Sequence, residues 1–173
     1  MTDFHKLYTL YADDIYRFSL FLCGDAVEAQ DITAETFARA LTGKAPLVSA
    51  TVKGYLLIIA RNLYLESLRR RKRLVRLAPE LPDVSAHLEQ AVSDRAEWEA
   101  LQHYLQEFAE VDRAALLLRS DGLSYEEIAR ALNISLASAK VKVHRLRLKL
   151  AEWPEKAEGM LPEQDGSRVP LDS

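Results

Sequence analysis

Residues 122–150, GLSYEEIARALNISLASAKVKVHRLRLKL, constrain the fold more than any other stretch of the chain. Ser124 followed by Glu127 is a capping box, which predicts a helix starting directly after the serine. That helix is expected to stop at Asn133, a residue that tolerates a tight turn, and Ser135 is placed to cap a second helix. Two helices joined by so short a turn predict a helix-turn-helix, whose second helix can enter a DNA major groove.

The expected second helix has two different sides. Its apolar residues recur at steps of four, three and four, which places them on one buried side: Ala139, Val143, Leu146 and Leu150. The opposite side presents Lys140, Val141, His144 and Arg145, with Lys142, Arg147 and Lys149 on the flanks. Because no acidic residue lies on this exposed side, we favour nucleic-acid binding over an ordinary solvated helix face.

Charge is distributed unevenly along the 173 residues, although the net charge is only −3. Residues 1–78 carry 12 basic and 8 acidic side chains, and residues 79–111 carry 1 and 8. Residues 112–150 carry 8 and 4, and residues 151–173 carry 2 and 6. Two basic blocks separated by an acidic one indicate two DNA-facing modules on a linker.

The first basic block is predicted to contain three helices. An apolar repeat from Phe4 to Leu22 ends at Gly24, and the Asp25–Glu28 cap pair starts a second helix over residues 26–41. A third begins near residue 51 and continues into the basic run at residues 69–73. Such runs are commonly solubilising or targeting signals. Here Tyr55, Arg61 and Asn62 precede the run, and aromatic and amide groups beside cations fit binding to single strands.

Asp31, Glu35 and Arg39 recur at four-residue spacing on the second helix. They form either a solvated face with an acid-to-base pair or a docking surface for a large partner. Periodicity alone favours the solvated face.

We predict an all-α fold with two small helical domains that have no sheet and no shared core. The predicted ranges are 1–77 for the first domain, 78–93 for a flexible acidic linker with two prolines, and 94–153 for the second. Residues 154–173, rich in proline, glycine and acids, are expected to form a poorly ordered tail.

Several functional classes are not supported by the sequence. One cysteine permits neither an internal disulfide nor a cysteine-based zinc site. The four histidines are scattered, no glycine-rich phosphate loop occurs, and no catalytic constellation is found, so we expect no metal, no cofactor and no enzymatic activity. The chain starts without a signal peptide and has no membrane-spanning apolar run, which predicts a cytoplasmic protein.

Three motifs resemble those of the extracytoplasmic-function (ECF) sigma factors of bacterial RNA polymerase. DGLSYEEIA at 121–129 resembles the opening of sigma domain 4, and IARNL at 59–63 with the following basic run resembles the promoter-melting helix of sigma domain 2. AQDITAETF at 29–37 resembles the polymerase-docking helix of that domain. The resemblance covers nearly all of residues 4–150, with the motifs in the family's order.

This resemblance implies a protein that gives core RNA polymerase its promoter choice and performs no chemistry. Asp31, Ala34 and Glu35 would dock on the clamp helices, which reverses the preference for a solvated face. Domain 4 would bind the −35 element while resting on the flap, and domain 2 would open the −10 element and capture a flipped base with Asn62. An anti-sigma factor is a further expected partner.

The candidate DNA contacts fall into two sets. The −35 set is Ser138, Lys140, Val141, Lys142, His144, Arg145 and Arg147, and the −10 set is Tyr55, Arg61, Asn62, Arg69, Arg73 and Arg76. We expect Arg145 to bind a guanine and Val141 a thymine methyl.

Two alternatives are weaker. A stand-alone helix-turn-helix regulator gives no role to the helix that bears Arg61 and Asn62. A decoy that only sequesters an anti-sigma factor does not need DNA-facing cations.

Overall fold

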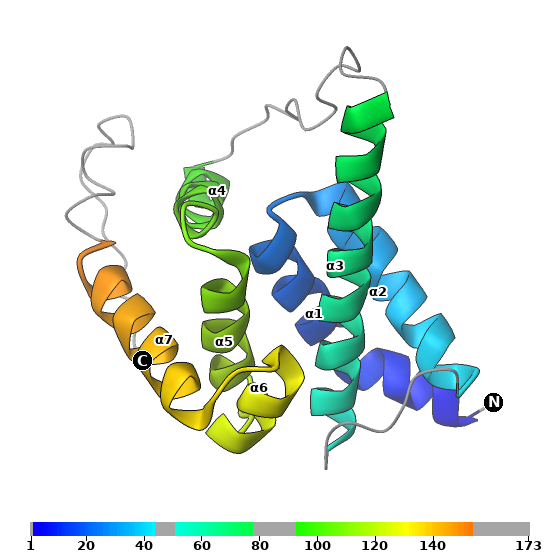
Figure 1. Ribbon diagram of the computed structural model, residues 1–173. Coiled ribbons are helices and arrows are strands. Elements are labelled where there is room, and N and C mark those ends of the chain that lie inside the picture. Colours follow the sequence, from blue (N-terminus) through cyan, green and yellow to red (C-terminus); the bar gives the residue numbers. More distant parts are fainter. Residues whose placement is uncertain (1, 44–50, 78–92, 154–173) are drawn as a thin grey trace.

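The computed structural model describes residues 2–43, 51–77 and 93–153, which form seven helices and no strand within those ranges (Figure 1). The first half contains α1 (Thr2–Cys23), α2 (Ala26–Leu41) and α3 (Val52–Leu77). The second half contains α4 (Ser93–Leu105), α5 (Glu110–Ser120), α6 (Tyr125–Leu132) and α7 (Leu136–Ala151). The predicted all-α class is confirmed. The predicted tail, and the predicted linker apart from its last residue, lie outside the described residues.

Three helices start at the caps that the sequence predicted. In each case a side-chain oxygen accepts a hydrogen bond from the backbone N–H three residues later: Asp25 from Glu28 at 3.0 Å, Ser124 from Glu127 at 3.1 Å, and Ser135 from Ser138 at 3.0 Å. The turn between α6 and α7 is made by Asn133, whose φ of 53° and ψ of 50° are left-handed. Asparagine adopts this conformation more easily than most residues, so the local sequence fixes the helix-turn-helix.

Each half buries its own apolar stripe. In the first half, α1 packs on α2 and α3 around fully buried side chains that include Phe18, Phe37 and Leu56. In the second half, α5 packs on α6 and α7 around Leu118, Ile128, Val143 and Leu146. Burying a side chain of this size stabilises a fold by about 1.5–3 kcal/mol.

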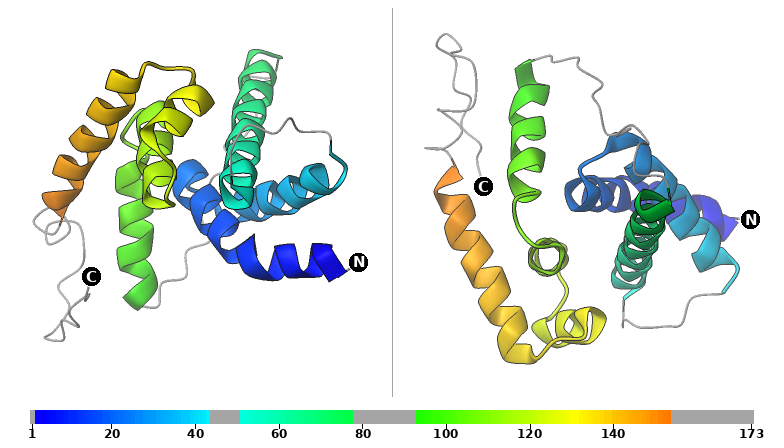
Figure 2. Two further views of the ribbon diagram at one scale, coloured as in Figure 1. Left: turned by 90° about the horizontal axis from the view of Figure 1, so that it is seen from below. Right: turned by 45° about the horizontal axis from the view of Figure 1, so that its top comes forward.

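The two halves also pack against each other, so the predicted absence of a shared core is wrong. Buried apolar residues of both halves form one continuous cluster, and Figures 1 and 2 show α5 lying between α7 and the first three helices. The end of α1 explains part of this packing, because the last carbonyls of a helix have no partner within it. Gln106 donates to the carbonyls of Phe21 and Leu22, and Arg113 on α5 also donates to Leu22.

Candidate nucleic-acid interface

The outward side of α7 lies where the sequence predicted. Ala139, Val143 and Leu146 are buried, whereas the opposite side is exposed at Lys140, Val141, His144, Arg145 and Arg147. Val141 is 51% exposed, which means that it does not pack against the domain. Within the described ranges, none of the exposed cations on this side forms an ion pair. The surface is therefore a basic helix face with two exposed apolar residues, Val141 and Leu148, and its contact with DNA stays a prediction.

Lys142 differs from its neighbours on α7. Its Nζ lies 2.9 Å from Oδ1 of Asp112 on α5, and both side chains are largely covered. This ion pair holds α7 against α5. Because Asp112 already compensates the charge of Lys142, we expect this lysine to attract a DNA phosphate less strongly than the sequence suggested. Ser138 is partly exposed, and its backbone N–H is used by the Ser135 cap.

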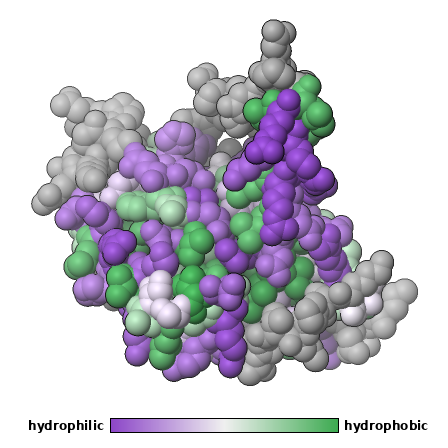
Figure 3. Space-filling view, viewed as in Figure 1, coloured by the Kyte–Doolittle hydropathy of each residue, from purple (hydrophilic) through white to green (hydrophobic). Residues whose placement is uncertain are grey.

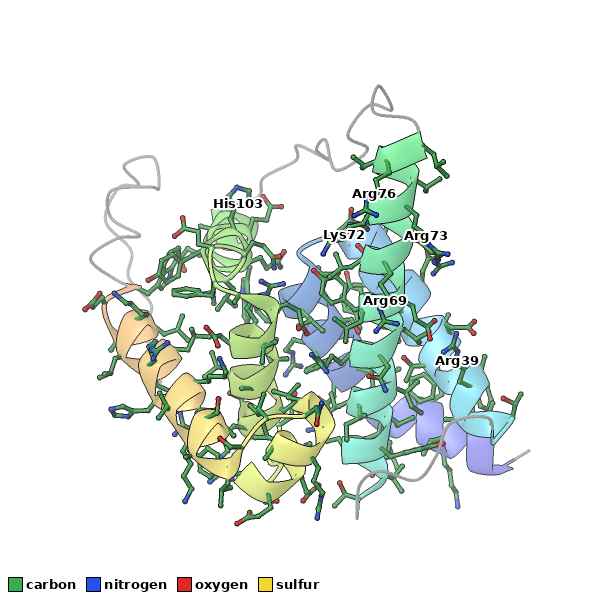
Figure 4. All side chains as sticks on the ribbon, in the orientation of Figure 1. Arg39, Arg69, Lys72, Arg73, Arg76 and His103 are labelled. Atoms are coloured by element: carbon green, nitrogen blue, oxygen red, sulfur yellow. The ribbon has the colours of Figure 1, made fainter. Side chains whose placement is uncertain are left out.

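Five of the six −10 candidates lie on one stripe of α3. Seven residues make nearly two full turns of a helix, falling short by only about 20°. Tyr55, Asn62, Arg69 and Arg76 follow one another at this spacing, and Arg73 lies one turn after Arg69. Asn62 and the arginines are exposed, and Tyr55 is half-buried. Figure 4 shows Arg69 about midway along α3, and Arg73 and Arg76 nearer the end that projects beyond the other helices. Figure 3 shows hydrophilic side chains along this part of α3 and hydrophobic ones at its tip, where Leu74, Val75 and Leu77 are exposed. One helix face thus presents an aromatic ring, an amide and three cations.

Arg61 faces away from this stripe, toward α5. Its Nε and Nη2 donate to Oε1 and Oε2 of Glu110 at 2.9 and 3.0 Å, and its Nη1 donates to the carbonyl of Ala131 at 3.4 Å. The Arg61 side chain is only 8% exposed and that of Glu110 only 15%. In this arrangement the guanidinium is not accessible to DNA, so the predicted −10 role of Arg61 requires the ion pair to open.

The exposed side of α2 lies along a groove between α2 and α3. Asp31, Ala34 and Glu35 line one wall of this groove. Arg39 links the two helices, because it donates to Glu35 at 3.2 Å and to both carboxylate oxygens of Glu66 at 3.1 Å (labelled in Figure 4). The hydrogen bonds from Arg39 lower the pKa of the Glu66 carboxyl. The groove is thus rimmed by acids on α2 and by the basic run of α3.

Sequence reasoning missed the residues that connect the halves. Arg113 is 5% exposed and lies three residues before buried Leu116. A basic residue at a helix position where an apolar residue is expected was the sequence signal that could have identified it. Lys53 on α3 lies 3.5 Å from Asp14 on α1 and 3.3 Å from Asp121 after α5. Burial lowers the pKa of Lys53, but the two carboxylates outweigh it and the net pKa is raised.

Other kinds of site receive no support from the described residues. Over residues 2–43, 51–77 and 93–153, no group of three His, Cys, Asp or Glu side chains is placed to hold a metal ion. Nor does any helix in that part of the chain have both the length and the apolar content to cross a membrane. Burial raises the pKa of the Cys23 thiol to about 12, so the thiol stays protonated at neutral pH and is a poor nucleophile.

Comparisons with known proteins connect both halves to one family. Residues 7–74 match the family model of sigma-70 region 2, and residues 98–150 match that of sigma-70 region 4. The chain is 33% identical over 159 residues to the ECF RNA polymerase sigma factor SigE of Mycolicibacterium smegmatis, covering 88% of this chain and 62% of that relative's length. It is 31% identical over 150 residues to the ECF sigma factor SigM of Bacillus subtilis, covering 84% of this chain and 91% of SigM.

A solved structure has the same fold. It is the sigma factor RpoE in complex with the anti-sigma factor NepR from Bartonella quintana, with a TM-score of 0.71 and 22% identity over 90% of this chain and 98% of that one. The match to region 2 includes the α3 stripe except Arg76 and the α2 face, which a stand-alone helix-turn-helix regulator leaves without a role. The chain belongs to the family of ECF RNA polymerase sigma factors.

Proposed function

We propose that this protein binds core RNA polymerase through the exposed face of α2 and directs the enzyme to promoters with α7 and α3. The observation that supports this most directly is the stripe on α3, where Tyr55, Asn62 and three exposed arginines share one face. An aromatic ring can stack on an unpaired base while cations neutralise the adjacent phosphates. Separately, α7 carries the side chains that could bind base edges of duplex −35 DNA.

Run-off transcription with purified core polymerase and a candidate promoter tests the function as a whole.

The clamp helices of the largest polymerase subunit are the proposed partner of Asp31, Ala34 and Glu35. Asp31→Lys combined with Glu35→Lys should abolish core binding in a pull-down. Exposed substitutions typically change stability by less than about 0.5 kcal/mol, so the melting temperature should stay nearly unchanged.

A matched control is Asp13→Lys combined with Glu126→Lys, which makes the same change in net charge at exposed positions on α1 and α6. Retained core binding in the control and loss in the α2 variant would support the docking face. Equal binding by both variants would contradict it.

The roles on α3 are proposed to differ along the stripe. Asn62 would contact an unstacked base of the −10 element, and the arginines would contact phosphates. Asn62→Ala should therefore impair promoter opening, seen as lost permanganate reactivity of unpaired thymines, while closed-complex binding is largely kept. If opening and closed binding fall together in Asn62→Ala, this division of roles is wrong.

An anti-sigma factor and a cytoplasmic location belong to the same proposal. One structural relative of this chain is bound to an anti-sigma factor. A protein that acts on RNA polymerase and promoter DNA is expected in the cytoplasm, where both are located. Co-purification of the full chain with a specific inhibitor that blocks run-off transcription would support the first point. Domain ranges of 1–77 and 94–153 remain the proposed functional units, each with its own DNA element.

A further inference from the structure

One of the contacts between the halves is a buried ion pair. Arg61 and Glu110 face each other through two parallel hydrogen bonds of 2.9 and 3.0 Å, the geometry in which an arginine and a carboxylate interact most strongly. Both side chains are largely shielded from water. Removing the charge of one partner would leave the other charge buried and uncompensated, which is strongly unfavourable. The ion pair can form only when the halves are packed together, and it therefore stabilises that closed arrangement.

Other contacts across the same boundary involve none of the candidate DNA contacts. Gln106 and Arg113 donate to backbone carbonyls at the end of α1, and the Phe21 and Trp98 rings lie 5.5 Å apart. These contacts use main-chain atoms and apolar surface, and a second ion pair joins Lys53 on α3 to Asp121 after α5 at 3.3 Å. By contrast, Arg61 is one of the candidate DNA contacts and lies next to Asn62.

The closed arrangement is too short to engage both promoter elements at once. The numbers that name the −35 and −10 elements differ by about 25 base pairs, which is roughly 85 Å along B-form DNA at about 3.4 Å per base pair. A compact chain of about 150 residues has a radius of gyration near 15 Å, and hence a diameter of roughly 40 Å. Simultaneous binding by α3 and α7 therefore requires the halves to separate.

We propose that the Arg61–Glu110 ion pair is an autoinhibitory latch between the two DNA-binding halves, and that Glu110 occupies the guanidinium until core polymerase separates them. This inference rests on the proposed function and deepens it, because opening the latch both lengthens the protein and releases a cation beside Asn62. Glu110 thereby acts as an internal competitor for a group that the −10 element uses.

Glu110→Gln in the full chain tests the latch directly, because it removes the charge and keeps the shape. Small-angle X-ray scattering of the unbound protein should show a larger radius of gyration than the wild type. The control is Glu107→Gln, which removes a charge from an exposed side chain three residues earlier and should leave the radius unchanged. An unchanged radius in Glu110→Gln overturns the latch.

A charge swap separates the ion pair from nonspecific damage. Arg61→Glu alone should open the protein, and Arg61→Glu combined with Glu110→Arg should return the radius of gyration toward the wild-type value. If the double variant is as open as the single variant, the pair does not hold the halves together.

The second measurement is the affinity for core polymerase. A latch reduces apparent affinity by the fraction of molecules that are open, so Glu110→Gln should bind core more tightly, by roughly five- to tenfold. A variant that opens but binds core no more tightly would show that closure does not regulate the protein. If neither the wild type nor the variant binds core, the proposed function fails, while the scattering result still decides whether the latch exists.

Discussion

The basic helices α3 and α7 use their cations differently. On α7 the exposed cations lie on the outward side and on its flanks, and among the residues that the structure describes the Lys142 side chain alone forms an ion pair with another helix. On α3 the cations divide, since Arg69, Arg73 and Arg76 lie on an exposed stripe while Arg61 is buried against α5. The cause is what packs on each helix, because α5 covers one side of α3. A basic residue in a DNA-binding helix can therefore serve the fold or the ligand, and its neighbours decide which.

The strongest test of the buried cations is Arg113→Ala. The guanidinium donates to the Leu22 carbonyl at 3.2 and 2.9 Å and to the Tyr64 hydroxyl at 3.3 Å. Alanine removes all of these donors and leaves the Leu22 carbonyl with only the 3.4 Å hydrogen bond from Gln106, so the free energy of unfolding should fall by about 2–4 kcal/mol in urea denaturation. Arg130→Ala, at an exposed position on α6, should change it by less than about 0.5 kcal/mol. Similar losses in both variants would break the distinction between buried and exposed cations.

Arg145→Ala tests the outward face of α7. The exposed guanidinium can make two hydrogen bonds to O6 and N7 of a guanine, so its loss should cost about 1–3 kcal/mol of −35 binding and relax preference at one base pair. Stability should be nearly unchanged. Fluorescence anisotropy on a panel of single-base −35 variants measures the binding affinity and the base preference. A uniform loss of affinity over all sites would indicate a phosphate contact instead.

The stripe arginines should act through charge alone. Arg69→Ala, Arg73→Ala or Arg76→Ala should each reduce the slope of log affinity against log salt by about 0.9 on duplex DNA and about 0.7 on single strands. Holoenzyme binding to a promoter between low and moderate salt gives these slopes. Arg17→Ala, at an exposed position on α1, is the control and should leave the slope as it is. If Arg17→Ala reduces the slope by the same amount, the stripe arginines are not specific phosphate contacts.

Val141→Ser should have a smaller effect than the loss of an arginine. The exposed methyl groups suit apolar contact with the methyl of a thymine in the major groove. Serine should therefore weaken −35 binding by less than about 1 kcal/mol, and it should reduce discrimination between thymine and uracil. The test is to measure binding to −35 sites in which each thymine in turn is replaced by uracil. If the wild-type protein binds thymine and uracil equally well at every position, Val141 does not contact a thymine methyl.

The smallest expected effect is at the exposed pair of Arg39 and Glu66, which contrasts with the buried pair. Hydrogen bonds from Arg39 lower the pKa of Glu66 in the folded protein. The stabilisation is therefore present above the unfolded pKa and is lost as the pH falls through the folded pKa. Because both side chains are more than a third exposed, it should not exceed about 0.5 kcal/mol. In an NMR titration, Arg39→Gln should raise the Glu66 midpoint, and an unmoved midpoint would contradict this.

Much of the local structure could be predicted because it depends on neighbours in the chain. The Ser124 and Ser135 caps and the Asn133 turn are interactions within three residues, so the helix-turn-helix follows from its own sequence. The outward side of α7 follows from periodicity, since burying one apolar stripe exposes the opposite one. For the same reason Asp31 and Glu35 were correctly expected on an exposed helix side.

The fate of Arg61 was decided only by the tertiary structure. Along the chain it is a cation beside Asn62 and ahead of a basic run, and this pattern is the same whether the guanidinium meets a phosphate or a carboxylate. Its partner, Glu110, is 49 residues away. An interaction over that separation leaves no periodic trace in the sequence. The position of Arg113 among apolar residues indicates that it is buried, but it does not identify the partner at the end of α1. The sequence by itself determined the helices, their caps and their exposed faces, and the packing of the halves determined which charged groups were left for DNA.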